Sequence, residues 1–319
     1  MYKNSVGNSL KVTVVIPAFK VSRHIEKVIN TLPEQIDQII VVDDACPENS
    51  GLVAHALANK KVEVVTHQEN QGVGGAMKSG YRTALLNGAD IVVKVDGDGQ
   101  MDPSEIENLL LPLLTNAADY SKGNRFYSLK TVRSMPKVRL FGNVVLSFMS
   151  KISTGFYQIF DPNNGFTAIT SEGLKLIELD SVDDRYFFES DMLYQINSVG
   201  MMAVDIPMPA IYGEEVSNLS VGHSVIYFLI KHLKNALKRI VLTYFIRDFS
   251  IATVQLILGT VIGFWGIFAG TSTWLQSKSS GVPSQPGTIV LVAILCITGL
   301  QLLLSFINYD ISLARRRKS

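Results

Sequence analysis

Short apolar runs recur about every 25 residues in the first third of the chain, and each is bounded by turn-forming residues. Stretches of helical periodicity separate them, near residues 24–32, 50–58 and 74–87. Apolar strands that alternate with helices are typical of a parallel sheet covered on both faces. The pattern therefore predicts an α/β domain with a Rossmann-like, mostly parallel sheet. Its first four strands are expected at residues 12–16, 39–42, 62–66 and 91–95.

The C-terminal third of the chain has a different pattern. Residues 250–270 and 287–308 are two long runs without a charged residue. A helix of about 20 apolar residues spans the roughly 30 Å core of a bilayer. The segment between the runs, residues 271–286, is rich in Ser, Gly and Pro. We expect a two-helix transmembrane hairpin with this segment as its connection; a pair of buried core helices is the alternative.

A third pattern precedes the hairpin. Apolar residues recur at helical spacing over residues 223–245, while Lys231, Lys234 and Lys238 share another face. This favours an amphipathic helix in the headgroup layer, although a solvated basic face on a soluble helix would look the same. The chain is thus divided into a catalytic domain (1–222), a juxtamembrane helix (223–248) and a hairpin with a basic tail (249–319).

The distribution of basic residues predicts the orientation. Lysine and arginine gather on both outer flanks of the two runs, whereas the connection between them holds only Lys278. By the positive-inside rule, both ends and the large N-terminal domain should be cytoplasmic. The N-terminus has no apolar stretch long enough for a signal peptide, which agrees with that expectation.

Composition narrows the function classes. Only 18% of residues are charged, against about a quarter in an ordinary soluble domain, and the two apolar runs account for the deficit. The net charge of +1 offers no basic field for nucleic acid. Two cysteines without further ligands at suitable spacing exclude a disulfide framework and a structural zinc site.

Ligand-type residues follow each of the four strands. In parallel sheets, ligands collect at the carboxyl ends of the strands. Two carboxylate pairs at neighbouring ends would repel each other unless a divalent cation with a diphosphate compensates them. The glycine-rich segment lacks the ending of a P-loop and the spacing of a dinucleotide-binding motif, so nucleotide hydrolysis and hydride transfer are disfavoured. These segments are Pro17-Ala18-Phe19, Asp43-Asp44, Asn70 to Ala76, and Asp96-Gly97-Asp98-Gly99-Gln100.

These segments, in this order, resemble the inverting, metal-dependent GT-A glycosyltransferases of family 2. The motifs are VVIPAFK (14–20), VVDDACPENS (41–50), NQGVGGAMKSG (70–80) and VKVDGDGQMDP (93–103). Four later segments, followed by the apolar hairpin, are similar to the polyprenyl-phosphate branch, which includes dolichyl-phosphate mannose synthase and its bacterial relatives. They are KGNRF (122–126), DPNNGFTAI (161–169), RYFFESDML (185–193) and AIYGEEVSNLS (210–220).

The resemblance implies a reaction. A sugar would pass with inversion from a UDP- or GDP-linked donor to undecaprenyl or dolichyl phosphate at the cytoplasmic face of the membrane, giving a lipid-phosphate-linked monosaccharide. Membrane lipid is a further expected partner, nucleic acid is not, and a homo-oligomer is left open. The cofactor would be Mg²⁺ or Mn²⁺, held by Asp96, Asp98 and Gln100. The residues expected to bind the nucleotide sugar are Pro17, Ala18, Phe19, Asp44, Gly72, Lys78, Asp96 and Gly97.

On the acceptor side, a phosphate oxygen is already anionic, so positive charge is needed more than a general base. The expected phosphate-binding residues are Arg125, Arg133, Lys137 and Arg139. The expected catalytic residues are Asp98, Arg125, Asp161 and Asp191, of which Asp191 would act as the base if the acceptor were a hydroxyl. For Asp43 a simple turn cap is the expected role.

Two other functions are considered. A family 2 enzyme acting on a saccharide hydroxyl, as in polysaccharide synthesis, should carry a Gln-x-x-Arg-Trp motif, but neither Trp265 nor Trp274 follows an arginine. A non-catalytic nucleotide-binding scaffold on the membrane should have lost its metal carboxylates, yet Asp96 and Asp98 are both present.

Overall fold

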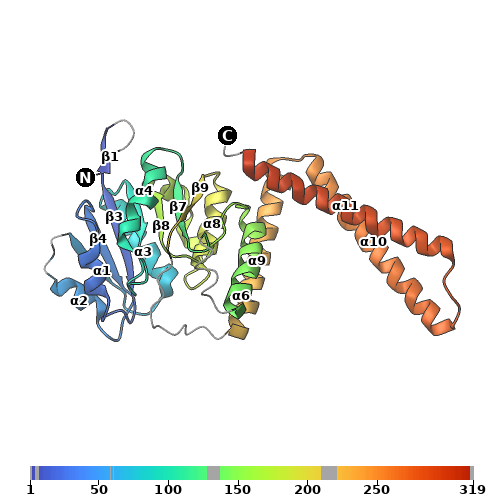
Figure 1. Ribbon diagram of the computed structural model, residues 1–319, viewed down its shortest axis with the longest axis horizontal. Coiled ribbons are helices and arrows are strands. Elements are labelled where there is room, and N and C mark those ends of the chain that lie inside the picture. The colour runs from blue at the N-terminus through green and yellow to red at the C-terminus, as the bar shows by residue number, and fades with distance from the viewer. Residues whose placement is uncertain are drawn as a thin grey trace. The chain divides into compact units, whose positions relative to one another are not determined.

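A computed structural model describes residues 2–3, 7–57, 59, 61–127, 137–209 and 221–316 of the chain. By their internal contacts the residues form two compact units, Met1–Ala236 and Leu237–Ser319. Each unit is described by itself, and Figure 1 labels their elements.

The first unit is built on a seven-stranded sheet with the strand order β5-β4-β3-β6-β8-β7-β9. All neighbouring strands are parallel except where β8 pairs with β6 and β7. The predicted mostly parallel sheet is therefore confirmed. The strands are β3 (Val12–Ala18), β4 (Gln38–Asp43), β5 (Val62–Thr66), β6 (Ile91–Lys94), β7 (Tyr120–Asn124), β8 (Thr167–Thr170) and β9 (Ala203–Pro207), and the two-residue strands β1 (Tyr2–Lys3) and β2 (Ser9–Leu10) form a separate pair.

Helices cover both faces of the sheet, as uniformly apolar strands require. Successive strand residues point to opposite faces, so Val14 belongs to one apolar cluster and Val15 to the other. The first face is covered by α1 (Ile25–Thr31), α2 (Ser50–Ala56) and α4 (Ile106–Leu114), which follows the short 3-10 helix Pro103–Glu105. The second face is covered by α3 (Gly72–Leu86), α7 (Ser171–Leu176), the 3-10 helix Leu179–Ser181 and α8 (Phe188–Ser198).

Two further helices belong to this part of the chain. Helix α6 (Lys137–Thr154) precedes β8, and α9 (Val221–Val241) follows β9. The π-helical turn Leu242–Arg247 continues α9. The predicted juxtamembrane helix is present, but its residues up to Ala236 belong to the first compact unit. The aromatic ring of Phe187 packs against Phe228 and His232 of α9, with ring centroids 5.5 and 4.8 Å away.

The second unit contains α10 (Ile251–Ser280) and α11 (Pro286–Arg316). Both are long and apolar enough to cross a membrane. The predicted connection at residues 271–286 is too long, because α10 continues through Thr271 to Ser280, where neither glycine nor proline interrupts it. The helix ends at Gly281, whose φ of 67° lies in the left-handed region that glycine tolerates.

Small residues bring α10 and α11 together. A Cβ atom added to Gly299 would lie 2.6 Å from the Gly263 backbone, so only glycine allows this approach. A buried ion pair also joins the two ends of the unit. Nη1 and Nη2 of Arg239 each donate to one carboxylate oxygen of Asp310 at 2.8 Å, and Asp310 also accepts a 2.7 Å hydrogen bond from the Tyr244 hydroxyl.

Candidate active site

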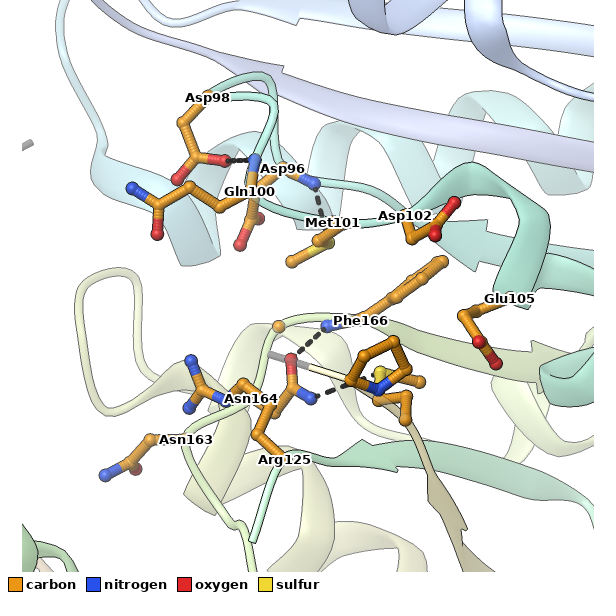
Figure 2. A pocket seen from close by; sticks show the side chains of 13 residues that line it. Asp96, Asp98, Gln100, Met101, Asp102, Glu105, Arg125, Asn163, Asn164 and Phe166 are labelled. Carbon is orange, nitrogen blue, oxygen red and sulfur yellow. Dashed lines mark hydrogen bonds between the residues drawn. The ribbon is translucent and has the colours of Figure 1, made fainter. Parts of the chain in front are cut away.

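A cavity opens at the carboxyl end of β6. Asp96, Asp98 and Gln100 lie on one wall, and Arg125 and the Asn163–Gly165 loop lie on the wall opposite (Figure 2). The first wall follows β6, while the second comes from the residue after β7 and from the loop before β8. The structure therefore brings together the predicted metal ligands and Arg125, which are separated in the sequence.

Asp96 is held in place by a buried lysine. Lys94 Nζ lies 2.6 Å from Asp96 Oδ1 and 3.2 Å from Glu189 Oε1. Burial alone would lower the pKa of Lys94, but the two carboxylates outweigh it and raise that pKa above its ordinary value. A Cβ atom on Gly165 would lie 2.6 Å from Asp96 Oδ2 and would also overlap the ammonium group. Glycine is thus required beside this ion pair.

The two carboxylates and the amide of Gln100 fit a divalent cation that arrives with a diphosphate. Mg²⁺ and Mn²⁺ prefer oxygen ligands, and Mg²⁺ is commonly held by one or two carboxylates together with water and substrate phosphates. Among the described residues, no group of three or more His, Cys, Asp or Glu side chains is arranged to hold a metal. Three protein ligands on an octahedral cation would leave about half of its coordination positions to the nucleotide and water.

The Asp43-Asp44 pair is arranged differently. Asp43 accepts hydrogen bonds from the backbone N–H groups of Cys46 (2.7 Å) and Gly51 (2.6 Å), so the expected turn cap is confirmed. Asp44 is also buried and accepts hydrogen bonds from the N–H groups of Gln71 (2.9 Å) and Gly72 (2.8 Å). These contacts tie the end of β4 to the loop before α3. Contact of Asp44 with a nucleobase stays a prediction.

The glycine-rich start of α3 packs against protein backbone. Gly75 N–H donates to Asp184 O at 3.0 Å, and Lys78 Nζ donates to Asp184 Oδ1 at 2.7 Å. Gly72 has a φ of +89°, and a Cβ atom there would lie 2.6 Å from the same Asp184 carbonyl oxygen. The residues before α8 therefore cover this helix start, and nucleotide-sugar binding by Gly72 and Lys78 stays a prediction.

The remaining residues expected at the donor lie at neighbouring strand ends. Ala18 is buried at the end of β3, and its carbonyl accepts a 3.1 Å hydrogen bond from Asp44 N–H. Phe19, which follows it, is exposed. A Cβ atom on Gly97 would lie 3.4 Å from Pro17 O, so the ends of β3 and β6 are in close contact.

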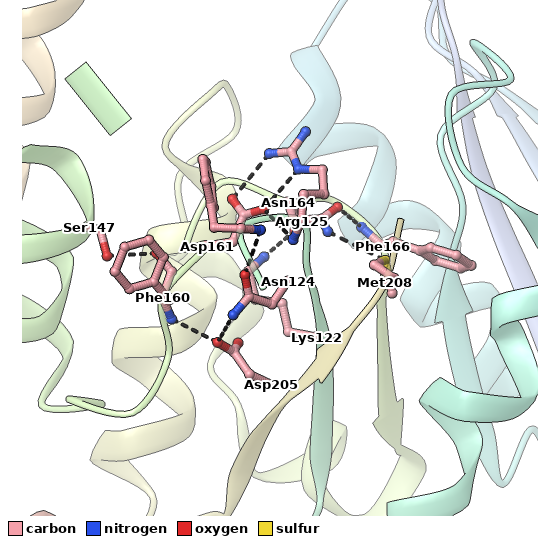
Figure 3. Close-up of polar contacts among 11 residues, drawn as sticks. Lys122, Asn124, Arg125, Ser147, Phe160, Asp161, Asn164, Phe166, Asp205 and Met208 are labelled. Atoms are coloured by element: carbon pink, nitrogen blue, oxygen red, sulfur yellow. Dashed lines mark hydrogen bonds and ion pairs between the residues drawn. The ribbon is translucent and has the colours of Figure 1, made fainter. Parts of the chain in front are cut away.

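Arg125 and Asp161 form a two-pronged ion pair at the edge of the cavity (Figure 3). Arg125 Nε donates to Asp161 Oδ2 at 2.8 Å, and Nη2 donates to Oδ1 at 3.1 Å. Asp161 is almost completely buried. Its carboxylate therefore fixes the plane of the guanidinium that the sequence predicts to bind a phosphate.

Asp191 is not among the residues that line this cavity, and its catalytic role stays a prediction. Asp191 Oδ1 accepts a 2.5 Å hydrogen bond from Asn235 of α9, and Oδ2 accepts one of 2.9 Å from Asp183 N–H. Burial raises the pKa of Asp191. These two contacts attach α9 to α8 and to the segment before it.

Three predicted acceptor residues are not described at the level of their side chains. Arg133 lies outside the described residues, as does the segment 210–220. Lys137 and Arg139 belong to the first turn of α6, and their backbone positions alone are described.

Sequence reasoning missed a buried polar network beneath Arg125. Lys122 Nζ donates to Asn164 O, and burial lowers the pKa of Lys122 to about 8. Asp205 accepts from Asn124 Nδ2 (3.0 Å) and Phe160 N–H (2.8 Å), and burial raises its pKa to about 6. The sequence did contain a sign of these buried cations, because Lys94 and Lys122 are each the one charged residue of their strand.

The sequence profile described as "Glycosyl transferase family 2" matches residues 13–176, from the first large strand to the end of α7. The chain belongs to glycosyl transferase family 2. The predicted family is confirmed, and the protein is a glycosyltransferase.

The names of three curated relatives specify a lipid phosphate acceptor or product. The UDP-N-acetylglucosamine–dolichyl-phosphate N-acetylglucosaminyltransferase of Methanococcus voltae is 29% identical over 236 residues, which cover 68% of this chain and 94% of that protein. The polyprenol monophosphomannose synthase of Mycolicibacterium smegmatis is 28% identical, covering 64% of this chain and 78% of its own. The undecaprenyl-phosphate mannosyltransferase of Micrococcus luteus is 26% identical, with 68% and 92% covered.

Solved structures of glycosyltransferases share the fold. Glucosyl-3-phosphoglycerate synthase from Mycobacterium tuberculosis, solved with Mn²⁺, UDP and glucosyl-3-phosphoglycerate, superimposes with a TM-score of 0.54 at 19% identity over 72% of this chain and 80% of that one. Mannosyl-3-phosphoglycerate synthase from Rubrobacter xylanophilus gives 0.56 at 17% identity, with 76% and 77% covered. The GT-A fold predicted for this glycosyltransferase is confirmed.

Proposed function

We propose that this glycosyltransferase moves a sugar, with inversion, from a nucleotide diphosphate sugar to a polyprenyl phosphate. The observation that carries the proposal is a cavity with Asp96 and Asp98 on one wall and Arg125 on the other, in a chain that continues into two helices of membrane length. The names of three relatives, each specifying a polyprenyl or dolichyl phosphate acceptor or product, support it.

On the donor side, Asp96, Asp98 and Gln100 would hold Mg²⁺ or Mn²⁺ against the diphosphate. The bound cation neutralises the charge that develops on the departing nucleoside diphosphate. Lys94 keeps Oδ1 of Asp96 engaged, so the other carboxylate oxygen is directed toward Gly165 and the cavity. Phe19 is exposed beside these strand ends and offers an aromatic face to a nucleobase.

On the acceptor side, a phosphate oxygen attacks the anomeric carbon from the face opposite the leaving group. One carbon–oxygen bond to the acceptor phosphate forms while the bond to the nucleoside diphosphate breaks, which inverts the anomeric centre. Arg125, oriented by Asp161, would bind the acceptor phosphate. Asp191, the predicted base for a hydroxyl acceptor, is engaged by Asn235, which favours the phosphate over a saccharide hydroxyl.

We also propose that α10 and α11 span the membrane with the catalytic domain and both flanks on the cytoplasmic side. The basic residues outside both helices support this orientation. The division into residues 1–222, 223–248 and 249–319 remains our functional division, although the compact units meet at Ala236 and Leu237.

The test uses the full chain in lipid vesicles, a panel of UDP- and GDP-linked sugars, and undecaprenyl phosphate. We expect one donor to give a lipid-phosphate-linked monosaccharide, identified by mass spectrometry, and to release nucleoside diphosphate in equal amount. Transfer to a saccharide hydroxyl, with none to the lipid phosphate across the panel, would overturn the proposal.

A further inference from the structure

One carboxylate oxygen joins the two chain segments that carry the Arg125–Asp161 ion pair. Asp205 Oδ2, on β9, accepts hydrogen bonds from Asn124 Nδ2 at 3.0 Å and from the Phe160 N–H at 2.8 Å (Figure 3). Asn124 immediately precedes Arg125 in the sequence, and Phe160 immediately precedes Asp161. Asp205 therefore anchors the residue before each member of the ion pair.

The register of the sheet explains how Asp205 reaches Asn124. Strands β7 and β9 are parallel, and Lys122 lies opposite Asp205. Since residues two apart in a strand point to the same face, the side chains of Lys122, Asn124 and Asp205 share one face of the sheet. Asn124 is buried, and its Oδ1 accepts a 2.9 Å hydrogen bond from the Phe126 N–H. The Asn124 amide thus links β9 to the turn that presents Arg125.

The segment that carries Asp161 is held from two sides. The Phe160 N–H donates to Asp205, while the Phe160 carbonyl accepts a 2.6 Å hydrogen bond from Ser147 Oγ of α6. The rings of Phe126 and Phe160 also pack edge to face, with their centroids 5.6 Å apart. The backbone is therefore fixed directly before Asp161, so β9 and α6 together determine where its carboxylate lies.

The surroundings of Asp205 are not those of a residue that serves stability alone. Its second oxygen, Oδ1, is buried and has no hydrogen-bond partner among the described residues. A buried carboxylate oxygen without a donor costs stability, and burial accordingly raises the pKa of Asp205 to about 6. The position of the two anchored segments is a better reason for this carboxylate than the stability that it adds.

We propose that Asp205 is a positioning residue for the acceptor phosphate, and that it acts by fixing the place of the Arg125–Asp161 pair in the cavity. The ion pair sets the plane of the guanidinium, but a phosphate that binds Arg125 competes with Asp161 for the same N–H groups. Anchoring both backbones on one oxygen holds the guanidinium in place during that competition, as precise positioning requires. The inference rests on the proposed function, because it assigns the acceptor phosphate to Arg125.

The experiment compares variants of the full chain in lipid vesicles, with undecaprenyl phosphate as the acceptor. Asp205→Ala removes the shared oxygen. Asp205→Asn keeps an amide oxygen that can accept both hydrogen bonds, because both end on the same atom. Asn124→Ala removes one link only, and it gives the same readout should Asp205→Ala fail to fold.

The matched control is Asp119→Ala. Asp119 lies directly before β7, is half-buried like Asp205, and accepts a 2.8 Å hydrogen bond from the N–H of Met202, which precedes β9. It therefore joins the same two strands at the end away from Arg125. KM for the acceptor and KM for the nucleotide sugar are each measured with the other substrate saturating, together with the unfolding midpoint.

We expect Asp205→Ala to raise KM for undecaprenyl phosphate about thirtyfold, while KM for the nucleotide sugar stays within about twofold of the wild type. Asn124→Ala should raise the same KM by a smaller factor, and Asp205→Asn should restore most of the acceptor affinity. Asp119→Ala should leave both constants unchanged even where it lowers the unfolding midpoint.

Equal changes in both constants would overturn the inference, since they indicate general damage to the site. A loss in Asp205→Asn as large as in Asp205→Ala would also overturn it, because a shared acceptor oxygen would not be what matters. The two proposals fail in different ways. An active wild type whose acceptor KM is unaltered in Asp205→Ala and Asn124→Ala removes this inference only, whereas a wild type that transfers no sugar to undecaprenyl phosphate removes the proposed function and this inference with it.

Discussion

Two pairs of aspartates lie at the ends of β4 and β6, on either side of β3 in one sheet, and not at neighbouring strand ends as expected; their surroundings also differ. After β4, both oxygens of Asp43 and both oxygens of Asp44 accept hydrogen bonds from backbone N–H groups. After β6, Asp96 and Asp98 line a cavity, and Asp96 is paired with the buried ammonium of Lys94. Both pairs are aspartates at strand ends, but the groups that donate hydrogen bonds to their carboxylates differ.

The comparison indicates which carboxylates can bind a cation: those whose charge is not already compensated by backbone N–H groups. Backbone N–H groups from the segment after β4 and from the start of α3 satisfy the oxygens of Asp43 and Asp44, and they lower the need for a cation. Asp96 and Asp98 instead line the cavity, where Asp98 Oδ1 accepts a 2.9 Å hydrogen bond from Gln100 N–H. The second pair can therefore take part of its compensation from a metal and a diphosphate.

The largest expected effect belongs to Asp98. Asp98→Asn removes a negative ligand while keeping the size, so kcat/KM for sugar transfer should fall by about a thousandfold or more, equivalent to roughly 4 kcal/mol. Binding of Mn²⁺ in the presence of UDP, followed by electron paramagnetic resonance, should weaken in parallel, while the unfolding midpoint stays the same. Full transfer activity in excess chelator would contradict this expectation.

For Asp43→Ala we expect the opposite of Asp98→Asn: the protein should lose stability but keep its affinity for metal and nucleotide. The buried N–H groups of Cys46 and Gly51 would lose a charged acceptor, so the free energy of unfolding should fall by roughly 3 to 5 kcal/mol. Denaturant unfolding of the detergent-solubilised protein measures the loss. Affinity for Mn²⁺ and UDP should remain unchanged below the unfolding transition. A stable Asp43→Ala protein without metal affinity would show that the two pairs have been assigned the wrong way round.

The two buried lysines, Lys94 and Lys122, can be compared in the same way, because their partners also differ. Lys94 is paired with two carboxylates, whereas Lys122 donates to a carbonyl and has its pKa lowered from 10.5 to about 8. The unfolded chain therefore binds more protons between pH 8 and 10.5, so stability should rise with pH across that window, by about 3 kcal/mol. Lys122→Met should remove this rise. The exposed Lys175→Met is the control, and an unchanged pH profile in Lys122→Met would exclude a lowered pKa.

Arg125 gives the smallest expected effect. Arg125→Lys keeps the charge but loses the planar fork that Asp161 orients, so kcat/KM should fall about tenfold to a hundredfold with stability nearly unchanged. The fall should appear mainly when polyprenyl phosphate is varied at saturating donor. Full activity of Arg125→Lys with loss in Arg125→Ala would mean that a point charge suffices; no loss in either would make the residue structural.

Most of the sheet could be predicted from the sequence, because each early strand is a short apolar run between turn residues. The predicted strand at 62–66 coincides with β5, and the other early strands differ by one or two residues at their ends. Residues 271–280 were expected in the connection, although their serines and threonines do not stop a helix. Gly281 does, since it can adopt a positive φ.

The candidate site was harder to predict where contacts join distant segments. Arg125 pairs with Asp161, 36 residues away, and Asn235 pairs with Asp191, 44 residues away. Helical periodicity identified α9 but could not tell that His232 and Asn235 face the protein, because that depends on partners in other elements. Which apolar residues of the same helix are exposed became clear only once the structure showed which of its residues are buried.

The ion pair of Arg239 with Asp310 has a consequence for how the chain is made. One partner precedes α10 and the other lies near the end of α11, so with both helices inserted the pair can form only after the chain has crossed the bilayer twice. Until then Arg239 lacks the carboxylate with which it pairs in the folded unit. With both helices inserted, the ion pair would therefore be a late contact of folding, formed after the last helix is in place.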